Sequence, residues 1–437
     1  MLSPVTAIAD ILRMSSGLGK LRHGIDSNGV FGSQCLPDDQ GAGRRVAVLA
    51  AHHVRAQGWN ATGGAEKYTL LVIDALLRAG ADVRVGYSGN SIYDMLANHP
   101  QGAHLELERL DWVNESMSGD ARLYPGTVLA RRRWLRDTRA ETLFVVQQGG
   151  GGAFGAALVA GRLLGMRVVS SIRQLPVTMP APTGKRWLKV IPSPELWRRR
   201  LIWRRRIPAW CCDAIIFNSE RVAKAHFDQA RHPRHRVRII YNGEQACFGG
   251  HETNGLPCRI ASVGRVTEAK GADLLLSAFG RIADRHPRAS LTYYGEGPLV
   301  PALRVKADTM GLGDRIMFAG YEPNRDTIYK NIDICVQPSR RESMSNSVVE
   351  AMARGIPCIV TDVGGLPETV LDGQTGFVVR PDQPEACAEA ISRLLTDRET
   401  YARFATASLD RVQSVFSLDR IMEDTVNTIL GLAPEAK

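Results

Sequence analysis

Residues 332 to 355 read IDICVQPSRRESMSNSVVEAMARG and place an apolar run, a polar loop and a second apolar segment in direct succession. The first run ends at Pro338 and is typical of a buried strand that leaves a sheet. Residues 345 to 347, which are Ser, Asn and Ser, favour the start of a helix, and the apolar residues after them have helical spacing. The stretch therefore predicts a buried strand, a loop and a helix.

Two carboxylates occupy this stretch. Glu342 lies on the loop, and we expect Glu350, eight positions later, within about the first turn of the helix. The first amides of a helix have no partner inside it and favour anions. A helix start at a strand end, with an acid on each side, indicates a site for a phosphorylated sugar.

Length and composition indicate a multidomain globular protein. A chain of 437 residues exceeds one ordinary core, so we expect two domains with extensions. Its 44% hydrophobic and 23% charged residues are typical of a soluble protein. No apolar run reaches the roughly 18 residues of a membrane span. The apolar patch at residues 8 to 12 is broken by Asp10, and we expect no signal peptide.

The cysteines are scattered without a C-x-x-C pair, and several lie in expected strands. This pattern is typical of reduced, buried thiols in a cytoplasmic protein. The adjacent His52 and His53 suit shared coordination poorly, so we expect no metal site. The eight cysteines are Cys35, Cys211, Cys212, Cys247, Cys258, Cys335, Cys358 and Cys387.

The net charge of +10 is concentrated in one region. Residues 185 to 206 hold nine Lys or Arg and one acid, a net charge of +8, and four Trp lie between 187 and 210. Residues 131 to 134, Arg-Arg-Arg-Trp, repeat the pattern. Arg with Trp at this density predicts peripheral contact with an anionic membrane, at the inner face of the plasma membrane, or with a lipid-linked substrate. A solvated basic helix face is the alternative, and nucleic acid is disfavoured because no nucleic-acid motif accompanies the charge.

Strand and helix patterns alternate along most of the chain and predict an α/β protein with two doubly wound, Rossmann-like domains facing each other across a cleft. We expect strands at 46–50, 82–87, 143–146, 168–172, 214–217, 237–240, 260–263, 290–294, 316–319, 332–337 and 359–361. We expect helices at 66–78, 156–164, 272–282, 299–310, 348–353 and 384–395.

Composition also sets the expected domain limits. Residues 1–43 lack periodicity and are expected to form a mobile extension. We expect an N-terminal domain at 44–245 and a Gly-rich linker at 246–257. A C-terminal domain is expected at 258–415, and a last helix in 416–437 is expected to pack back on the N-terminal domain.

Several expected strands of the second half end in glycine or charge. Gly264, Arg265 and Lys270 follow one strand, and two fixed cations there suit a diphosphate. Gly295 begins a tight turn after the next strand, and Gly320 ends a third. Parallel strands bring such ends to one edge of the sheet, which is where ligands bind.

This succession resembles the retaining glycosyltransferases of family four, the group 1 glycosyl transferases, which have the two-domain GT-B fold. The likeness covers roughly residues 258 to 380 and depends on the order and spacing of many short motifs. The motifs are Val263-Gly264-Arg265 with Lys270-Gly271, Gly295-Glu296-Gly297-Pro298, Gln337-Pro338-Ser339, the pair Glu342 and Glu350, the run from Glu350 to Pro357, and Gly364-Gly365 with Glu368.

The resemblance implies that the N-terminal domain binds the acceptor and the C-terminal domain the nucleotide sugar, and it implies a role for each matching residue. Arg265 and Lys270 would neutralise the nucleotide diphosphate, Glu350 would accept hydrogen bonds from the ribose, and Glu342 would approach the transferred sugar. The backbone around the nucleotide would include Gly264 and Gly320, and the amides near Met344, Ser345 and Asn346 would hold phosphate or sugar oxygens. No metal or other cofactor would be required. From the residues alone, Glu350 could equally be an acid of the first helical turn, and Glu342 a partner of Arg340 or Arg341.

The first half matches less fully. Gly63 and Gly64 resemble the family's Gly-Gly loop, whose backbone can approach donor or acceptor. Where the family often has a His after the strand at 168–172, this chain has Arg173, which cannot serve as a base at neutral pH. Arg173 would then contact substrate oxygens, and the departing phosphate would take the proton. Gln148 precedes four glycines, which either leave room for the acceptor or form a flexible turn.

The expected function is transfer of a hexosyl unit, with retained configuration, from a UDP- or GDP-linked sugar to a lipid-linked or polysaccharide acceptor in cell-surface glycan synthesis. A nucleotide-sugar epimerase or phosphorylase of the same architecture is one alternative. A non-catalytic sugar-nucleotide-binding protein is another, because the usual His is missing. The sequence does not set the oligomeric state.

Overall fold

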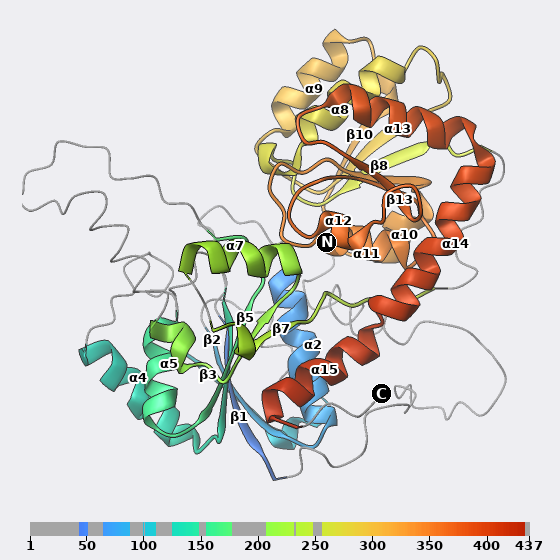
Figure 1. The fold of residues 1–437 in the computed structure, drawn as a ribbon. Helices are drawn as coiled ribbons and strands as arrows, with labels where there is room; N and C mark the ends of the chain where they lie inside the picture. Colours follow the sequence, from blue (N-terminus) through green and yellow to red (C-terminus); the bar gives the residue numbers. More distant parts are fainter. Residues whose placement is uncertain are drawn as a thin grey trace, which may run out of the picture. The chain divides into compact units, whose positions relative to one another are not determined.

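The computed structural model describes residues 43–50, 64–87, 99, 101–110, 125–147, 154–176, 207–230, 233–247 and 256–432. They belong to two compact units. The N-terminal unit comprises 36–241 with 421–437, and the C-terminal unit comprises 242–420. Both are α/β (Figure 1). The extension 1–42, Gly63, Gln148 with the glycines after it, and the basic segment 185–206 lie outside the described residues.

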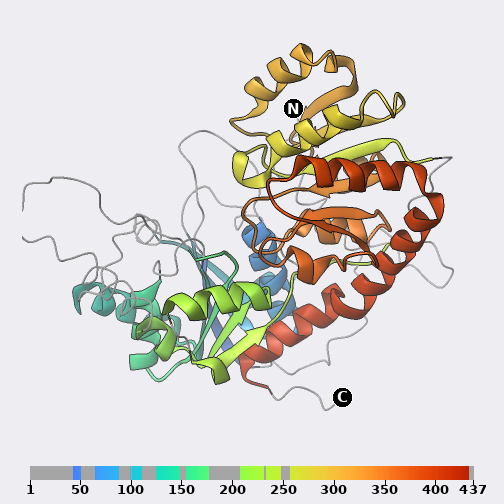
Figure 2. The same ribbon diagram turned by 45° about the horizontal axis from the view of Figure 1, so that its top comes forward.

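The N-terminal unit is built on a seven-stranded parallel sheet in the order β3-β2-β1-β4-β5-β6-β7. Its central strands are buried and mostly apolar because helices cover both faces of the sheet (Figure 2). The strands are β1 (Arg45–Ala50), β2 (Asp82–Tyr87), β3 (Leu105–Arg109), β4 (Thr142–Gln147), β5 (Arg167–Ile172), β6 (Ala214–Phe217) and β7 (Val237–Ile239).

The helices of this unit include the last helix of the chain. The guanidinium of Arg167 donates to the carbonyls of Thr428 and Ile429 at 3.0 and 3.1 Å, and Arg44 donates to Leu430 at 2.6 Å, so the end of that helix is tied to the sheet. The helices are α2 (Gly64–Arg78), α4 (Pro125–Thr138), α5 (Gly155–Leu163), α7 (Glu220–Ala230) and α15 (Leu418–Leu430), with short 3₁₀ turns η2 (Gly102–His104) and η3 (Arg234–Arg236).

The C-terminal unit contains a six-stranded parallel sheet in the order β10-β9-β8-β11-β12-β13. The strands are β8 (Arg259–Val263), β9 (Ser290–Tyr294), β10 (Ile316–Gly320), β11 (Ile334–Gln337), β12 (Cys358–Thr361) and β13 (Gly376–Val379). The helices are α8 (Ala272–Ile282), α9 (Val300–Thr309), α10 (Arg325–Lys330), α11 (Asn346–Met352), α12 (Leu366–Thr369), α13 (Pro384–Thr396) and α14 (Arg398–Val415), with 3₁₀ turns η4 (Glu268–Lys270) and η5 (Gly313–Arg315).

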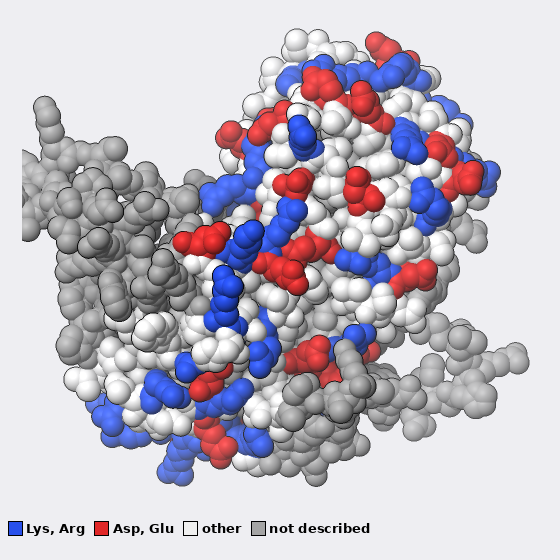
Figure 3. Space-filling model, in the orientation of Figure 1, with Lys and Arg blue, Asp and Glu red and all other residues white. Residues whose placement is uncertain are grey.

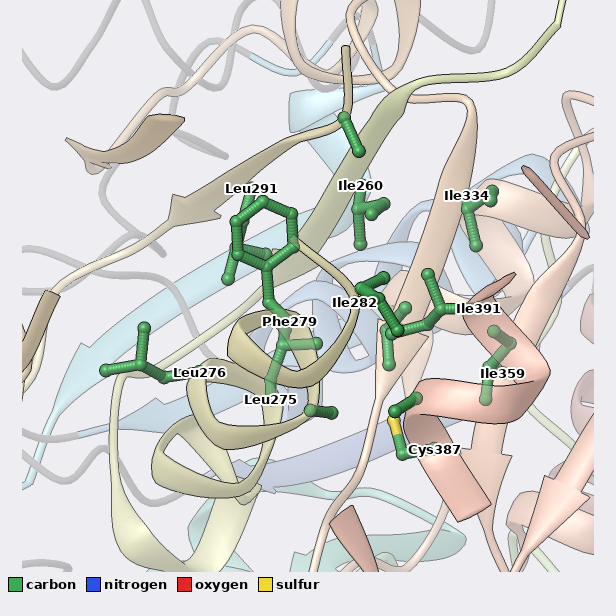
Figure 4. Close-up of a cluster of buried hydrophobic side chains, with 14 of the residues drawn as sticks. Ile260, Leu275, Leu276, Phe279, Ile282, Leu291, Ile334, Ile359, Cys387 and Ile391 are labelled. Carbon is green, nitrogen blue, oxygen red and sulfur yellow. The ribbon is translucent and has the colours of Figure 1, made fainter. Parts of the chain in front are cut away.

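One apolar core fixes the sheet of the C-terminal unit under α8 and α13. Phe279 and Ile282 of α8 and Ile391 of α13 are fully buried against Ile260 and Ile334 of the central strands (Figure 4). Burying a side chain of this kind contributes roughly 1.5 to 3 kcal/mol. The core therefore holds the carboxyl ends of β8 and β11, and the loops that follow them, on a rigid base.

The expected α/β class with two doubly wound parallel sheets is confirmed. The two units divide between Tyr241 and Asn242, ahead of the expected linker 246–257. The segment after Asn242 is tied to the C-terminal unit, since the Glu244 amide donates to Phe416 at 2.9 Å and the Cys247 amide to Ala353 at 2.6 Å. Glycine content alone did not reveal these bonds.

Two local expectations need correction. The strand expected at 332–337 begins at Ile334, and the Asp333 carboxylate just before it accepts bonds from the amides of Cys258 and Arg259 at 2.8 Å. Trp134 does not join Arg131 to Arg133 as a membrane-facing aromatic. It is 8% exposed, packs in the core of its unit and donates to Glu108 at 2.8 Å.

Of the described cysteines, Cys212, Cys335, Cys358 and Cys387 are buried, the others are half-buried, and all are free thiols. Over the described part of the chain, no helix combines the length and hydropathy needed to cross a membrane.

Candidate active site

Glycine loops join the ends of β8, β9 and β10. The Gly295 amide donates to the Gly320 carbonyl at 2.7 Å, and the Gly264 amide to the Tyr294 carbonyl at 2.8 Å. A Cβ on Gly295 would lie 2.1 Å from the Gly264 carbonyl oxygen, and its φ of +139° is open only to glycine. These three strand ends therefore lie backbone against backbone, with Gly264 exposed and Gly320 half-buried.

An ion pair joins the loops after β8 and β11. The ammonium of Lys270, at the end of η4, binds the carboxylate of Glu342, and their side chains are only 21% and 10% exposed. The backbone supports this pair, since the amides of Arg340 and Arg341 both donate to the Ala269 carbonyl, at 2.9 and 3.1 Å. Two predicted site residues, 72 positions apart, are thus held together at the carboxyl edge of the sheet.

The alternative reading of Glu342, as a partner of Arg340 or Arg341, is wrong within the described residues. Arg340 binds both oxygens of Asp273, at 2.7 and 2.8 Å, and one of Asp382 at 2.6 Å. Its bonds hold the pKa of Asp273 below the usual value. Arg341 is exposed and makes no described ion pair. Arg340 therefore anchors the loop through Asp273 and Asp382, and the ion-pair partner of Glu342 is Lys270.

The turn after β12 supports Glu342 from a third strand end. The Gly365 amide donates to the Ser343 carbonyl at 2.6 Å. Gly364 has a φ of +53°, and a Cβ there would lie 1.8 Å from the Glu342 carbonyl oxygen. Only glycine permits this approach, so residues 364 and 365 fix the height of the Glu342 backbone above the sheet.

The start of α11 lies beside this loop. Ser345 is the N-cap residue, but its hydroxyl makes no capping bond and lies 3.0 Å from that of Ser347. Buried Met344 places its sulfur 3.2 Å from the Asn242 amide, and the Asn346 side chain accepts from the Asn242 side chain. The amides of the first turn have no partner within the helix and can therefore bind anionic oxygens.

Glu350 lies beyond the first turn of α11, so the expectation of a first-turn acid is corrected. Its side chain is 1% exposed, and Oε2 accepts from Arg325 at 2.6 Å and from the hydroxyl of Tyr329 at 2.8 Å. The Glu350 charge raises the pKa of Arg325, while burial is the main cause that raises the pKa of Tyr329. Glu350 is thus a buried carboxylate held by two donors of α10, the half-buried guanidinium of Arg325 and the buried hydroxyl of Tyr329.

Arg265 differs from every other charged candidate in this unit. It follows Gly264 at the end of β8 and is exposed, and it makes no hydrogen bond or ion pair with the residues that the structure describes. A guanidinium with five N–H donors and no described acceptor is well suited to an anionic ligand.

The remaining candidates lie in the N-terminal unit. Arg173 follows β5, is 5% exposed and stacks 3.4 Å above the centroid of the Tyr68 ring. Burial lowers the pKa of its guanidinium. Gln147, at the end of the neighbouring β4, donates to Ser170 at 2.7 Å, while its buried side-chain oxygen has no partner among the described residues. Gly64, exposed, begins α2.

Sequence reasoning missed Arg325, Tyr329 and Asp273. The signal for α10 was present, since Asn324 accepts from the amides of Asp326 and Thr327 at 2.9 and 3.2 Å, as an N-cap does. A helix of only six residues has too little periodicity to stand out.

Two family models match this chain. Residues 62–243 match Glycosyltransferase Family 4, and residues 250–411 match Glycosyl transferases group 1. A lipopolysaccharide core biosynthesis mannosyltransferase, LpcC of Rhizobium leguminosarum, is 30% identical over 232 residues, which are 50% of this chain and 65% of that protein. A D-inositol 3-phosphate glycosyltransferase of Corynebacterium glutamicum is 34% identical over 36% of this chain and 39% of its own length. The matches thus span about two fifths to two thirds of these relatives.

Solved structures share the fold over most of the chain. The Anabaena protein Alr3699/HepE in complex with UDP has a TM-score of 0.66 at 17% identity, over 89% of this chain and all of that one. A glycosyltransferase from Rickettsia africae has a TM-score of 0.67 at 15% identity, over 89% and 99%. The chain belongs to the group 1 glycosyltransferases of family 4 type, with the GT-B fold, as the sequence motifs predicted.

Proposed function

We propose that this glycosyltransferase moves a hexosyl unit from a nucleoside-diphosphate sugar to a lipid-linked or polysaccharide acceptor, with retained anomeric configuration. The observation that carries the proposal is the half-buried Lys270–Glu342 ion pair, held where the loops after β8, β11 and β12 meet. In this proposal, Lys270 is a cation for phosphate and Glu342, beside it, an acid for the sugar.

The donor site follows from the charges around that pair. Arg265 and Lys270 neutralise the diphosphate, and the first amides of α11, near Met344, Ser345 and Asn346, bind phosphate or sugar oxygens. When the bond from the anomeric carbon to the phosphate oxygen breaks, negative charge grows on that oxygen. Fixed cations stabilise it without reorganisation, so the step needs no metal.

Glu342 and Glu350 contact the other two parts of the donor, the transferred sugar and the ribose. Glu342 lies beside the anomeric carbon and stabilises the positive charge of an oxocarbenium-like sugar. Glu350 accepts hydrogen bonds from the ribose hydroxyls, and Gly264 and Gly320 let the nucleotide approach the backbone. The relatives named as mannosyltransferase and D-inositol 3-phosphate glycosyltransferase, and the neighbour bound to UDP, support donors of this class.

The N-terminal unit supplies the acceptor half of the proposed reaction. Arg173 contacts acceptor or donor oxygens and does not accept a proton, and the backbone of Gly63 and Gly64 approaches donor or acceptor. The acceptor hydroxyl therefore passes its proton to the departing diphosphate as the new bond forms on the same face of the sugar.

We also propose peripheral contact of the N-terminal unit with an anionic membrane, as a cytoplasmic protein. Figure 3 shows more Lys and Arg than Asp and Glu over the visible face of that unit. Trp210 and Ile207, next to the basic segment in sequence, are 61% and 45% exposed, and Leu129 of α4 is 60% exposed. Basic side chains with protruding apolar ones are typical of a membrane surface.

A product assay tests the proposal. Purified protein is incubated with UDP-, GDP- and ADP-sugars, with and without a membrane extract that contains acceptors. We expect release of nucleoside diphosphate that depends on acceptor, and an NMR coupling constant at the new anomeric centre that matches that of the donor. An isomerised sugar without acceptor would indicate an epimerase. Nucleotide binding without turnover of any donor would refute the proposed activity.

A further inference from the structure

The carboxylate of Glu350 is buried between α10 and α11. Its Oε2 lies 2.6 Å from Arg325 and 2.8 Å from the hydroxyl of Tyr329, and Glu350 is 1% exposed. The same hydroxyl lies 3.1 Å from the Ser347 carbonyl of α11. A buried carboxylate stays ionised only where an opposite charge and hydrogen bonds compensate for lost hydration, and α10 supplies both.

A second set of contacts fixes the position of α10 against α11. Arg354, after the end of α11, donates to the Glu350 carbonyl at 3.0 Å and reaches Asp326 of α10 at 3.2 Å. Its guanidinium lies 4.9 Å from the centroid of the Tyr329 ring. Arg325 and Tyr329 therefore meet the Glu350 carboxylate in one set geometry, because the helix that carries them is bonded to the helix that carries Glu350.

We infer that Arg325 is a positioning residue for the donor. Arg325 keeps Glu350 ionised and in one rotamer for binding the nucleotide ribose, and the Tyr329 hydroxyl helps to hold the same carboxylate. This inference depends on the proposed function, because Glu350 is assigned there to the ribose. Arg325 itself need not touch the donor. Its removal should weaken hydrogen bonds between Glu350 and the 2′- and 3′-hydroxyls and leave the diphosphate contacts of Arg265 and Lys270 unchanged.

The test compares nucleotides with and without those hydroxyls. Calorimetry measures the binding of UDP, GDP and ADP and of their 2′,3′-dideoxy analogues to wild type, Arg325→Gln and Arg325→Lys. A hydrogen bond to a charged group contributes about tenfold or more to affinity. Arg325→Gln should therefore lower the affinity for the ribonucleotide that binds wild type most tightly by a similar factor. The dideoxy analogue should bind both proteins equally, and Arg325→Lys should recover part of the loss.

Arg281→Gln is the matched control. It removes the ion pair between Arg281 and Glu385 of the same unit, whose two side chains are 47% and 62% exposed, respectively. This change should leave nucleotide affinity unchanged. Equal affinity in Arg325→Gln and wild type, or an equal loss for ribo and dideoxy nucleotides, would overturn the inference.

Tyr329→Phe keeps the experiment decisive if Arg325→Gln does not fold. It removes one hydroxyl and should weaken the ribonucleotide alone, by about threefold to tenfold. No selective loss in this variant would equally overturn the inference. Wild-type protein that binds nucleotide but transfers no sugar would refute the proposed function, while the comparison of hydroxyls would still decide the role of Arg325.

Discussion

Gly364→Ala should separate the stability of the C-terminal unit from the placement of Glu342. The new Cβ would lie 1.8 Å from the Glu342 carbonyl oxygen, and reaching even 3.0 Å requires a shift of about 1.2 Å. Displacing a reacting group by about 1 Å costs on the order of 100-fold in rate. We therefore expect kcat/KM for the donor to fall about 100-fold in protein that remains folded.

The backbone cost is measured by a matched variant. Gly373 also has a positive φ, +69°, but a Cβ there meets nothing within 4 Å. Gly373→Ala should lose about 1 to 2 kcal/mol of unfolding free energy, which is the left-handed strain alone, and keep its activity. Urea denaturation gives the stabilities, and steady-state kinetics at a temperature where both variants are folded give the rates. If kcat/KM for the donor in Gly364→Ala lies within threefold of that in Gly373→Ala, the idea that this turn positions Glu342 is refuted.

Three further outcomes are expected. Lys270→Met should lower kcat/KM for the donor by about 10- to 100-fold, because a charge-assisted phosphate contact is lost, whereas Glu342→Gln should lower kcat and leave donor affinity within threefold by calorimetry. Trp210→Ala should weaken sedimentation with phosphatidylglycerol vesicles about tenfold, and unchanged sedimentation would remove Trp210 from the membrane surface. Arg340 lowers the pKa of Asp273, so their contribution to stability is complete above pH 3.8 and is lost as the pH falls through the lower pKa of the folded state. The stability difference between wild type and Arg340→Gln in urea should therefore be larger at pH 7 than below pH 3.8, and an equal difference at both would contradict this origin.

Apolar patterns were sufficient to predict most of the sheet strands, because strands buried on both faces have few polar positions to interrupt them. β3 escaped this reading. Its sequence, Leu-Glu-Leu-Glu-Arg, alternates with charge because it pairs on one side only, at the edge of the sheet. Edge strands are half-solvated, so their pattern is hard to distinguish from an exposed loop.

Trp134 shows where local pattern misleads. Beside three arginines it suggested a membrane contact, but in α4 the helical period turns Trp134 and Leu135 into the core while Arg132, Arg133 and Arg136 stay exposed. Its bond to Glu108, 26 positions away, satisfies the indole N–H. A composition count has no information about which face a residue occupies.

Some contacts of the candidate site could be predicted from the sequence and others could not. Strand order brings the predicted ends of β8 and β11 together, so the nearness of Lys270 and Glu342 follows from sequence and topology. The partners of Glu350 cannot be inferred from the sequence and the strand order. Arg325 lies 25 positions before it on a short helix, and the sheet order says nothing about how α10 meets α11. Contacts between helices on one face depend on packing, which no periodicity encodes.

Arg173 bears on the chemistry of the proposed reaction. Burial lowers the pKa of its guanidinium, yet arginine stays protonated in proteins, and its position above the Tyr68 ring favours the cation. A residue that is always charged can hold an oxygen but cannot remove a proton. If the N-terminal unit provides no base at this position, the basicity must come from the donor, whose departing phosphate oxygen gains charge as the glycosidic bond breaks. In the proposed reaction, Arg265 and Lys270 would have opposing effects, because neutralising that oxygen speeds its departure and reduces its strength as a base. We expect the Lys270–Glu342 pair to lessen this conflict, since Glu342 already neutralises part of the Lys270 charge.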